Sequence, residues 1–186
     1  MHGGAPRPLV NDEDLLERSL KGDPDAFRAL YDRHAGEVYG YARRIVGDGA
    51  AAEDVSQEVF LTVVRRGATF DRSRSFRPWL LTLVRNKSID WLRARSKRPE
   101  TKLEGEALEA LAAQAVAGSA GEAVDLALAR LPLAYRETLW LCDAMGLTYV
   151  EAGAILGCDP GTIGSRISRG RKALREHFSR NGHEVR

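Results

Sequence analysis

The sequence predicts an all-α protein made of two small helical domains joined by a flexible linker, the C-terminal one containing a helix-turn-helix. Apolar residues recur at spacings of three, four and seven over most of the chain, and no segment shows the alternation of a strand. An alanine-rich acidic stretch, EGEALEALAAQAVAGSAGE, interrupts this pattern and offers little to a core. We therefore expect domains at residues 10–97 and 122–180, with the linker at 98–121.

Four helices are expected in the first domain. A short one near residues 12–20 precedes a long amphipathic helix, which begins at Asp23 as N-cap and Pro24 in the first turn. The segment AAAEDVSQEVFLTVVRRG predicts a third helix that ends at Gly67. The fourth should run from about residue 76 to residue 95. Together these segments predict a helical bundle.

The C-terminal segment TYVEAGAILGCDPGTIGSRISRGRKALREH predicts a helix, a tight turn and a second helix. Thr148 and Glu151 form a capping box at the first helix start. Gly157 supplies the turn, and Asp159 with Pro160 opens the second helix. Upstream, the stretch AVDLALARLPLAYRETLWLCDAMG predicts two more helical segments.

Apolar and polar residues fall on opposite sides of that second helix. Ile163, Ile167 and Leu174, spaced by four and seven, should face inward. The outward side should then carry Thr162, Ser165, Arg166, Arg169 and Lys172. A helix with hydroxyls near its N-terminus and guanidiniums behind them suits the major groove of DNA, where it reaches base edges and phosphates together. A purely structural helix pair would not need the outward cations.

The charges are sorted along the chain. Residues 65–98 carry 11 Lys and Arg against 2 Asp and Glu, and residues 166–180 carry 6 against 1, although the net charge of the whole chain is only +2. Clustered cations raise the local potential and attract a polyanion. Either block alone could be an ordinary solvated helix face, but two such blocks favour nucleic acid as a partner.

The first basic block differs from the second because aromatic residues are interleaved with its cations. Single-stranded nucleic acid is held by flat rings on which unstacked bases rest and by cations along its backbone. One helical stripe carries Trp79, Asn86, Asp90 and Arg93. The polar loop at 70–75 could shape a pocket for an extruded base. The alternative, that the tryptophans belong to the core, is favoured for Trp91 but not for Trp79.

Several classes of protein lack support in the sequence. Cys142 and Cys158 are far apart, without a CxxC motif or a histidine pair, so neither a zinc site nor a disulfide framework is expected. No cofactor motif and no nucleophile–base pair is evident, so we expect a binding protein and not an enzyme. The N-terminus has no apolar signal region and no run long enough to span a bilayer, which predicts a cytoplasmic location without membrane insertion.

The chain contains, in this order, AFRALYDRHAGEVYGYARRIVGD, AEDVSQEVFLTVVRR, FDRSRSFRPWLLTLVRNKSIDWLRAR and LPLAYRETLWLCDAMGLTYVEAGAILGCDPGTIGSRISRGRKALRE. Together these motifs resemble the extracytoplasmic-function (group 4) sigma factors of bacterial RNA polymerase. The resemblance covers nearly the whole chain apart from the first ten residues, the linker and the last few. Several ordered motifs in one chain make it specific.

This resemblance implies a role for each motif. The segment that docks on the clamp helices of the polymerase largest subunit is matched by Asp54, Gln57 and Glu58. The part that recognises and melts the minus-ten element, with a loop that captures a flipped base, is matched by Phe70, Arg72, Ser73, Arg74, Trp79, Asn86, Lys87, Asp90 and Arg93. The part that reads the minus-thirty-five element as duplex is matched by Thr162, Ser165, Arg166, Arg169, Arg171 and Lys172. The flap of the second-largest subunit and an anti-sigma factor are further implied partners.

Two glycines depart from the family pattern. Gly164 stands where Lys or Arg is frequent and Gly153 where alanine is common, so we expect fewer phosphate contacts and a slightly looser reading head.

Rival functions remain open. A conventional dimeric helix-turn-helix regulator would leave the tryptophan-rich block unexplained. A nucleic-acid enzyme would need a carboxylate cluster for metal ions, for which Asp54 and Glu58 are the faint candidates. An adaptor fits the acidic segments but not the sorted cations.

Overall fold

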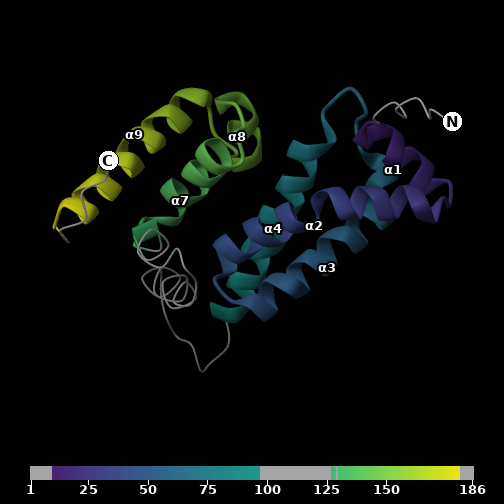
Figure 1. The fold of residues 1–186 in the computed structure, drawn as a ribbon, viewed down its shortest axis with the longest axis horizontal. Coiled ribbons are helices and arrows are strands. Elements are labelled where there is room, and N and C mark those ends of the chain that lie inside the picture. Colours follow the sequence, from purple (N-terminus) through teal and green to yellow (C-terminus); the bar gives the residue numbers. More distant parts are fainter. Residues whose placement is uncertain (1–9, 97–126, 129, 181–186) are drawn as a thin grey trace, which may run out of the picture.

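The computed structural model describes residues 10–96, 127–128 and 130–180, and these residues form helices and turns with no strand. Figure 1 shows two groups of helices, which confirms the predicted all-α class with two domains. The first group contains α1 (Asp12–Leu20), α2 (Pro24–Val46), α3 (Gly49–Arg66), the 3₁₀ turn η1 (Gly67–Thr69) and α4 (Phe76–Ser96). The second contains α7 (Leu133–Leu139), the π-helical segment η3 (Trp140–Ala144), α8 (Tyr149–Leu156) and α9 (Pro160–Arg180). The linker expected at 98–121 lies outside the described residues.

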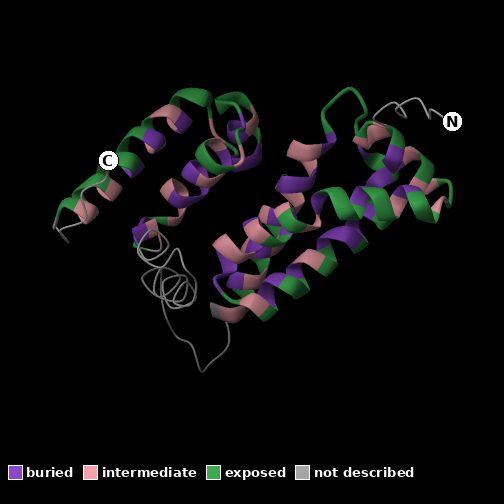
Figure 2. Ribbon diagram, viewed as in Figure 1, coloured by how far each residue is buried: buried purple, intermediate pink, exposed green. Residues whose placement is uncertain are grey.

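Helix α2 is the centre of the first group, where it packs against α1, α3 and α4. Its inner face is fully buried at Leu30, Val38, Tyr41 and Ile45. Helix α3 buries a stripe of valines, Val55, Val59 and Val63, as its helical spacing predicts. Figure 2 shows this division, with buried residues where the helices face each other and exposed residues on their outer sides.

Both ends of α2 follow the local signals in the sequence. The side chain of Asp23 accepts hydrogen bonds from the backbone N–H groups of Asp25 and Ala26, and Pro24 is the first helical residue. Gly47 ends the helix with φ +78°, in the left-handed region that glycine adopts without steric cost. The predicted start of this helix is therefore confirmed.

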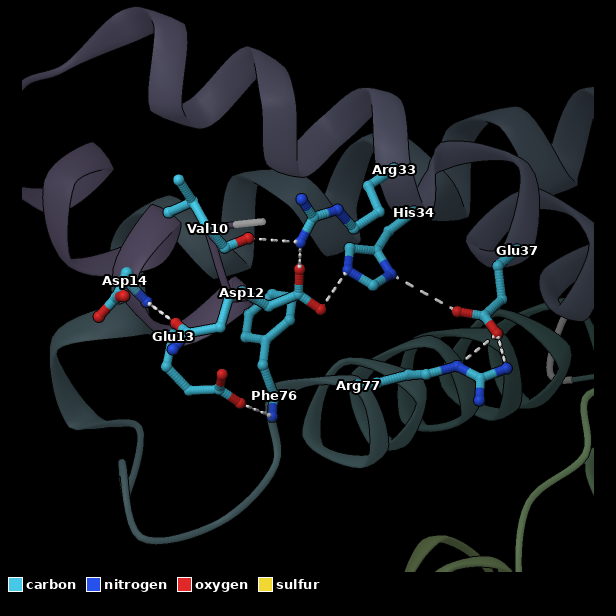
Figure 3. A network of polar contacts seen from close by, with 10 residues as sticks. Val10, Asp12, Glu13, Asp14, Arg33, His34, Glu37, Phe76 and Arg77 are labelled. Atoms are coloured by element: carbon cyan, nitrogen blue, oxygen red, sulfur yellow. Dashed lines mark hydrogen bonds and ion pairs between the residues drawn. The ribbon is translucent and has the colours of Figure 1, made fainter. Parts of the chain in front are cut away.

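A polar network ties α1 to the rest of the bundle (Figure 3). Asp12 pairs with Arg33 and lies 2.8 Å from the ring nitrogen Nε2 of His34. His34 is buried, and its other nitrogen lies 3.5 Å from Glu37, which pairs in turn with Arg77 of α4. Three helices are thus joined by one chain of polar contacts.

The start of α4 depends on α1 as well. The backbone N–H of Phe76 donates to the carboxylate of Glu13 at 2.8 Å. A helix leaves its first N–H groups without partners inside the helix, and a carboxylate near this end also interacts favourably with the helix dipole. Glu13 therefore stabilises a helix 63 residues away in the sequence.

The helix-turn-helix forms as its sequence predicts. Thr148 and Glu151 make the reciprocal capping box of α8. Gly157 closes α8 with φ +69°. Asp159 accepts from the backbone N–H of Thr162 at 2.9 Å and starts α9. Inside the pair, Ile163 and Ile167 are buried as expected, so α9 packs one face against α8 and α7.

The segment upstream of the turn differs from a plain α-helix. α7 begins directly after Pro132 and gives way at Trp140 to a π-helical segment that continues to Ala144. A π turn inserts an extra residue and rotates the side chains beyond it around the helix axis. Apolar spacing alone could not predict this insertion, because an α-helix and a π turn share nearly the same local pattern.

The two groups of helices pack directly on each other. Helix α8 lies against α4, and α7 lies against α2. The guanidinium of Arg44, on α2, stacks over the Trp140 ring at 4.4 Å. The second group therefore covers one side of the first.

Candidate nucleic-acid and polymerase interfaces

The outer face of α9 is open to solvent. Ser165, Arg169 and Lys172 are exposed, spaced by four and three residues along this face. Thr162, at the start of the helix, is half-buried, and its hydroxyl donates to Asp159 at 2.6 Å. The structure thus brings together an exposed hydroxyl and two exposed cations on one side of the helix, as the sequence predicts.

Two arginines of α9 lie differently from the prediction. Arg166, expected on the outward side, is half-buried and donates to the sulfur of Cys158 at 3.6 Å, because it flanks the buried stripe of Ile163 and Ile167. Arg171 is exposed but makes a two-pronged ion pair with Asp143 of η3, at 3.1 and 2.7 Å. The outward orientation predicted for Arg166 is therefore wrong, and the Arg171 guanidinium is held toward η3.

The two unusual glycines have different surroundings. A Cβ on Gly153 would lie 2.6 Å from the carbonyl oxygen of Cys158, so this glycine lets the turn approach α8 very closely. The turn and α8 are thus tightly packed at this position, which does not support the slightly looser reading head expected from the sequence. A Cβ on Gly164 would lie 3.5 Å from the ring of Tyr149, an ordinary contact distance. Close approach of the backbone therefore explains why residue 153 is a glycine. At position 164 no backbone comes close enough to require one.

The aromatic residues of the first basic block form a packed cluster. Phe70 and Phe76 are buried, and their rings lie 5.0 and 5.6 Å from the Trp79 ring, centroid to centroid. Phe70 was predicted to contact DNA, but its burial makes it a support for Trp79 and not an open surface for a base. Trp79 itself is half-buried. Trp91 is half-buried against the core, as favoured from the sequence.

Trp79 lies in the wall of a cavity of about 610 Å³ between the two groups of helices. We call this the interdomain cavity. Its first wall comes from residues 69–71, Arg74, Ser75, Pro78, Trp79 and Thr82, and its second wall comes from Val150, Glu151 and Ala154 of α8. The volume is that of a typical small-ligand pocket.

The loop at 70–75 is held by local contacts. The Asp71 carboxylate accepts from both the hydroxyl and the backbone N–H of Ser73, and these hydrogen bonds lower the pKa of Asp71. Arg72 pairs with Glu17 of α1 at 2.6 Å. Arg74 lies 3.3 Å from Asp71 and is highly exposed. The loop therefore places Arg74 in the wall of the interdomain cavity, and both Arg72 and Arg74 contact carboxylates.

Beyond the cavity, α4 carries a polar stripe. Asn86, Asp90 and Arg93 are exposed on it, as predicted, and Arg93 lies 3.5 Å from Asp90. Lys87 is half-buried and lies 3.4 Å from Glu58 of α3. One ion pair thus connects the predicted minus-ten surface to the predicted polymerase-docking surface.

The predicted docking residues Asp54, Gln57 and Glu58 are exposed on α3. Helical spacing continues their surface to Leu61 and Val64, which are 45% and 52% exposed. The sequence analysis missed these two apolar residues. Their exposure could have been found from the helical period, since residues beside the buried valine stripe must point outward.

Two simple features can be excluded within the described ranges. No helix there combines the length and apolar character needed to cross a membrane. Over those same residues, no three His, Cys, Asp or Glu side chains are grouped so as to hold a metal ion.

Comparisons with known proteins agree on one family. The family model of Sigma-70 region 2 matches residues 30–98, and that of Sigma-70 region 4 matches residues 121–174. The chain is 36% identical over 163 residues to the RNA polymerase sigma factor CarQ of Myxococcus xanthus, covering 87% of this chain and 94% of CarQ. It is 33% identical over 178 residues to the ECF RNA polymerase sigma factor SigW of Bacillus subtilis, covering 88% and 94%.

A solved structure shares the fold over most of the chain. The structure of CnrH in complex with the cytosolic domain of CnrY has a TM-score of 0.68 and 27% identity, covering 90% of this chain and 97% of the other. The matched regions include both groups of helices, and they contain nearly all residues of the sequence motifs that resemble this family. The chain therefore belongs to the ECF sigma factors of RNA polymerase, which direct promoter-specific transcription initiation.

Proposed function

We propose that this sigma factor docks on core RNA polymerase through α3, reads the minus-thirty-five element as duplex through α9, and holds the melted minus-ten strand on the wall of the interdomain cavity that carries Trp79. The observation that carries the proposal is the presence of two chemically different basic surfaces in one chain. The α9 face offers a hydroxyl and cations without an aromatic platform, whereas the cavity has Trp79 between the basic loop and the α4 stripe. The first suits paired bases and the second suits unpaired ones.

The free energy needed to open the DNA requires a contribution from the polymerase. Extruding a base costs a few kcal/mol, and stacking on an aromatic side chain returns about 1 to 3 kcal/mol. Phe70 and Trp79 both line the cavity, and Trp79, supported by Phe70 and Phe76, is the more exposed of the two. One stacked base cannot offset the opening of several base pairs, so the melted strand must be stabilised within the assembly. The chain acts by binding, and the polymerase supplies the phosphodiester chemistry.

The docking surface on α3 combines acidic residues with exposed apolar ones. Asp54 and Glu58 provide negative charge, and Leu61 and Val64 provide exposed apolar surface that a protein partner could bury. Interfaces between proteins typically combine an apolar centre with a polar rim. We assign this face to the clamp helices of the largest subunit. The flap of the second-largest subunit is assigned to the C-terminal domain.

We also propose an inhibitory protein partner of the anti-sigma class, and a cytoplasmic location for the sigma factor. CnrH, which shares this fold, was solved with the cytosolic domain of CnrY. RpoE of Bartonella quintana, solved with the anti-sigma factor NepR, also has this fold. A partner of this kind would act on the same two DNA-binding surfaces.

The direct test is run-off transcription with purified core polymerase on a promoter library. Specific starts should appear only when this protein is added. Trp79→Leu should then reduce open-complex formation by about 5- to 100-fold, since it keeps an apolar side chain but removes the stacking surface. Trp91→Leu is the matched control, because Trp91 is also a half-buried tryptophan of α4 but lies outside the cavity.

Two outcomes would contradict the proposal. The first is that no specific start appears and the chain does not associate with core polymerase. The second is tight binding to a palindromic duplex as a dimer without polymerase, which would support the conventional regulator instead.

A further inference from the structure

The contacts between the two groups of helices centre on one buried carboxylate. Glu137 of α7 is 3% exposed, and it accepts from the Arg85 guanidinium at 2.9 Å and from the Tyr41 hydroxyl at 3.2 Å. Burial raises the pKa of Glu137, and the guanidinium of Arg85 opposes this rise. A carboxylate this deeply buried depends on its cation, because an unpaired charge in the interior is costly.

A second contact joins the groups beside the cavity. Arg77, held by Glu37, also donates from Nη2 to the backbone carbonyl of Met145 at 2.9 Å. Arg77 and Arg85 belong to the basic block that precedes the linker. Both cations are therefore engaged by the C-terminal group of helices, one by a carboxylate and one by a carbonyl.

A third contact is steric. Gly40 of α2 faces the Trp140 ring, and a Cβ on Gly40 would lie 3.6 Å from Cζ2 of that ring. A Cβ at Gly40 would therefore be in ordinary contact with the indole, and a longer side chain would reach into the ring. The neighbouring turn is different, since a Cβ on Gly36 would meet nothing within 4 Å.

This packing covers the single-strand site and leaves the duplex site open. Val150, Glu151 and Ala154 form the wall of the interdomain cavity opposite Trp79, so a base that enters must compete with α8. In contrast, Ser165, Arg169 and Lys172 on the outer face of α9 remain exposed. The same arrangement therefore affects the two DNA-binding surfaces unequally.

We propose that this packing is an autoinhibited state, in which the C-terminal domain competes within the same chain for the minus-ten site and Glu137 occupies Arg85 in place of a DNA phosphate. The inference rests on the proposed function for the identity of the covered site. Its contacts include an ion pair, hydrogen bonds and an indole against a glycine, and domains of one chain commonly move relative to each other. Opening frees Arg85 from Glu137 and Arg77 from the Met145 carbonyl, while Arg77 keeps its pair with Glu37. The same movement uncovers Trp79.

The first test is a steric wedge with a matched control. Gly40→Leu adds a branched group beyond a Cβ that would already lie 3.6 Å from the Trp140 ring, so the leucine must displace the indole. Gly36→Leu adds the same side chain one turn earlier, where a Cβ meets nothing within 4 Å. Both changes favour the helical state of α2 equally. Small-angle X-ray scattering of the full chain should show a larger radius of gyration for Gly40→Leu and an unchanged one for Gly36→Leu. An unchanged radius for both would overturn the proposal.

The second test uses the buried charge. Arg85→Met leaves the Glu137 carboxylate without its cation in the closed state, so the chain should open and its radius should rise. Adding Glu137→Gln to that variant removes the stranded charge and should restore the smaller radius, since replacing both members of a buried pair costs far less than removing one. If the double variant keeps the larger radius of gyration, the pair of Glu137 and Arg85 does not hold the two domains together.

The third test measures the consequence for DNA. Fluorescence anisotropy with random-sequence single-stranded DNA of about 16 nucleotides should show Gly40→Leu binding about tenfold more tightly than the wild type and Gly36→Leu. An open chain with no gain in single-strand affinity would overturn autoinhibition. Failure of the proposed function can be distinguished from failure of this inference. The first appears as a lack of transcription starts with core polymerase, whereas the scattering experiments test the closed state without polymerase or DNA.

Discussion

Gly153 and Gly164 lie in the same helix-turn-helix, yet only one is required by the packing. Gly153 faces the backbone of the turn, which cannot move without moving α9, whereas Gly164 faces the half-exposed ring of Tyr149, which can rotate. An added side chain should therefore have different consequences at these two positions.

We expect opposite effects of alanine at these two positions. Gly164→Ala should raise the free energy of unfolding by up to about 1 kcal/mol, because it gains helix propensity and only touches Tyr149 at ordinary distance. Gly153→Ala should lower it by about 1 to 3 kcal/mol, because the added carbon overlaps the Cys158 carbonyl. Urea unfolding of the full chain followed by circular dichroism measures both. Equal effects would show that the turn adjusts freely.

The attachment of α1 illustrates how a whole helix depends on its partners. Its side chains Asp12 and Glu13 reach His34 and the start of α4, while Glu37 of α2 continues the network to Arg77. Burial raises the pKa of Glu37, but hydrogen bonds from His34 and Arg77 outweigh it, so the net pKa lies below its ordinary value of 4.5. The folded bundle thus favours the charged form of Glu37.

This shift predicts how stability changes with acid. A carboxyl with a lowered pKa in the folded protein contributes stability that is present above its ordinary pKa and is lost as the pH falls through the folded value. Glu37→Gln should therefore lower the free energy of unfolding near pH 7 and make it fall less steeply below about pH 4.5. Asp32→Asn, an exposed change on the same helix, is the control. Identical acid slopes for Glu37→Gln and the wild type would contradict the network.

In the complete molecule, the two proposed DNA-binding surfaces differ in how accessible they are. The α9 face points away from the first group of helices, as Figure 2 shows by its exposed residues, while α8 closes the cavity beside Trp79. The free protein should therefore recognise duplex before it can hold single strands. Such an order would couple melting to the opening of the chain on the polymerase.

We expect duplex binding to be insensitive to opening and sensitive to Arg169. Binding of the free chain to a minus-thirty-five duplex should be equal for the wild type and Gly40→Leu. Arg169→Ala should weaken it and reduce the slope of log affinity against log salt by about 1, whereas Arg171→Ala should change the slope less, because Arg171 is engaged by Asp143. Titrations over a range of salt concentrations measure this. Equal slopes for the two variants would place Arg171 on the DNA.

Features that depend on neighbours along the chain could be predicted from the sequence alone. Asp23 with Pro24, Thr148 with Glu151, and Gly157 set helix boundaries where the structure has them, because caps and turns are completed within a few residues. The exposed cations of α9 and the stripe on α4 were predicted from the same helical period.

The partners of long side chains and the burial of aromatic ones depended instead on tertiary packing. Arg166 turns to Cys158, Phe70 supports Trp79 from inside, and Glu137 meets Arg85 across 52 positions of sequence. A guanidinium at the edge of a helix face can reach either solvent or a neighbouring helix, and only the packing selects between them. The closed arrangement of the two domains is for this reason a property of the folded chain, which no local pattern contains.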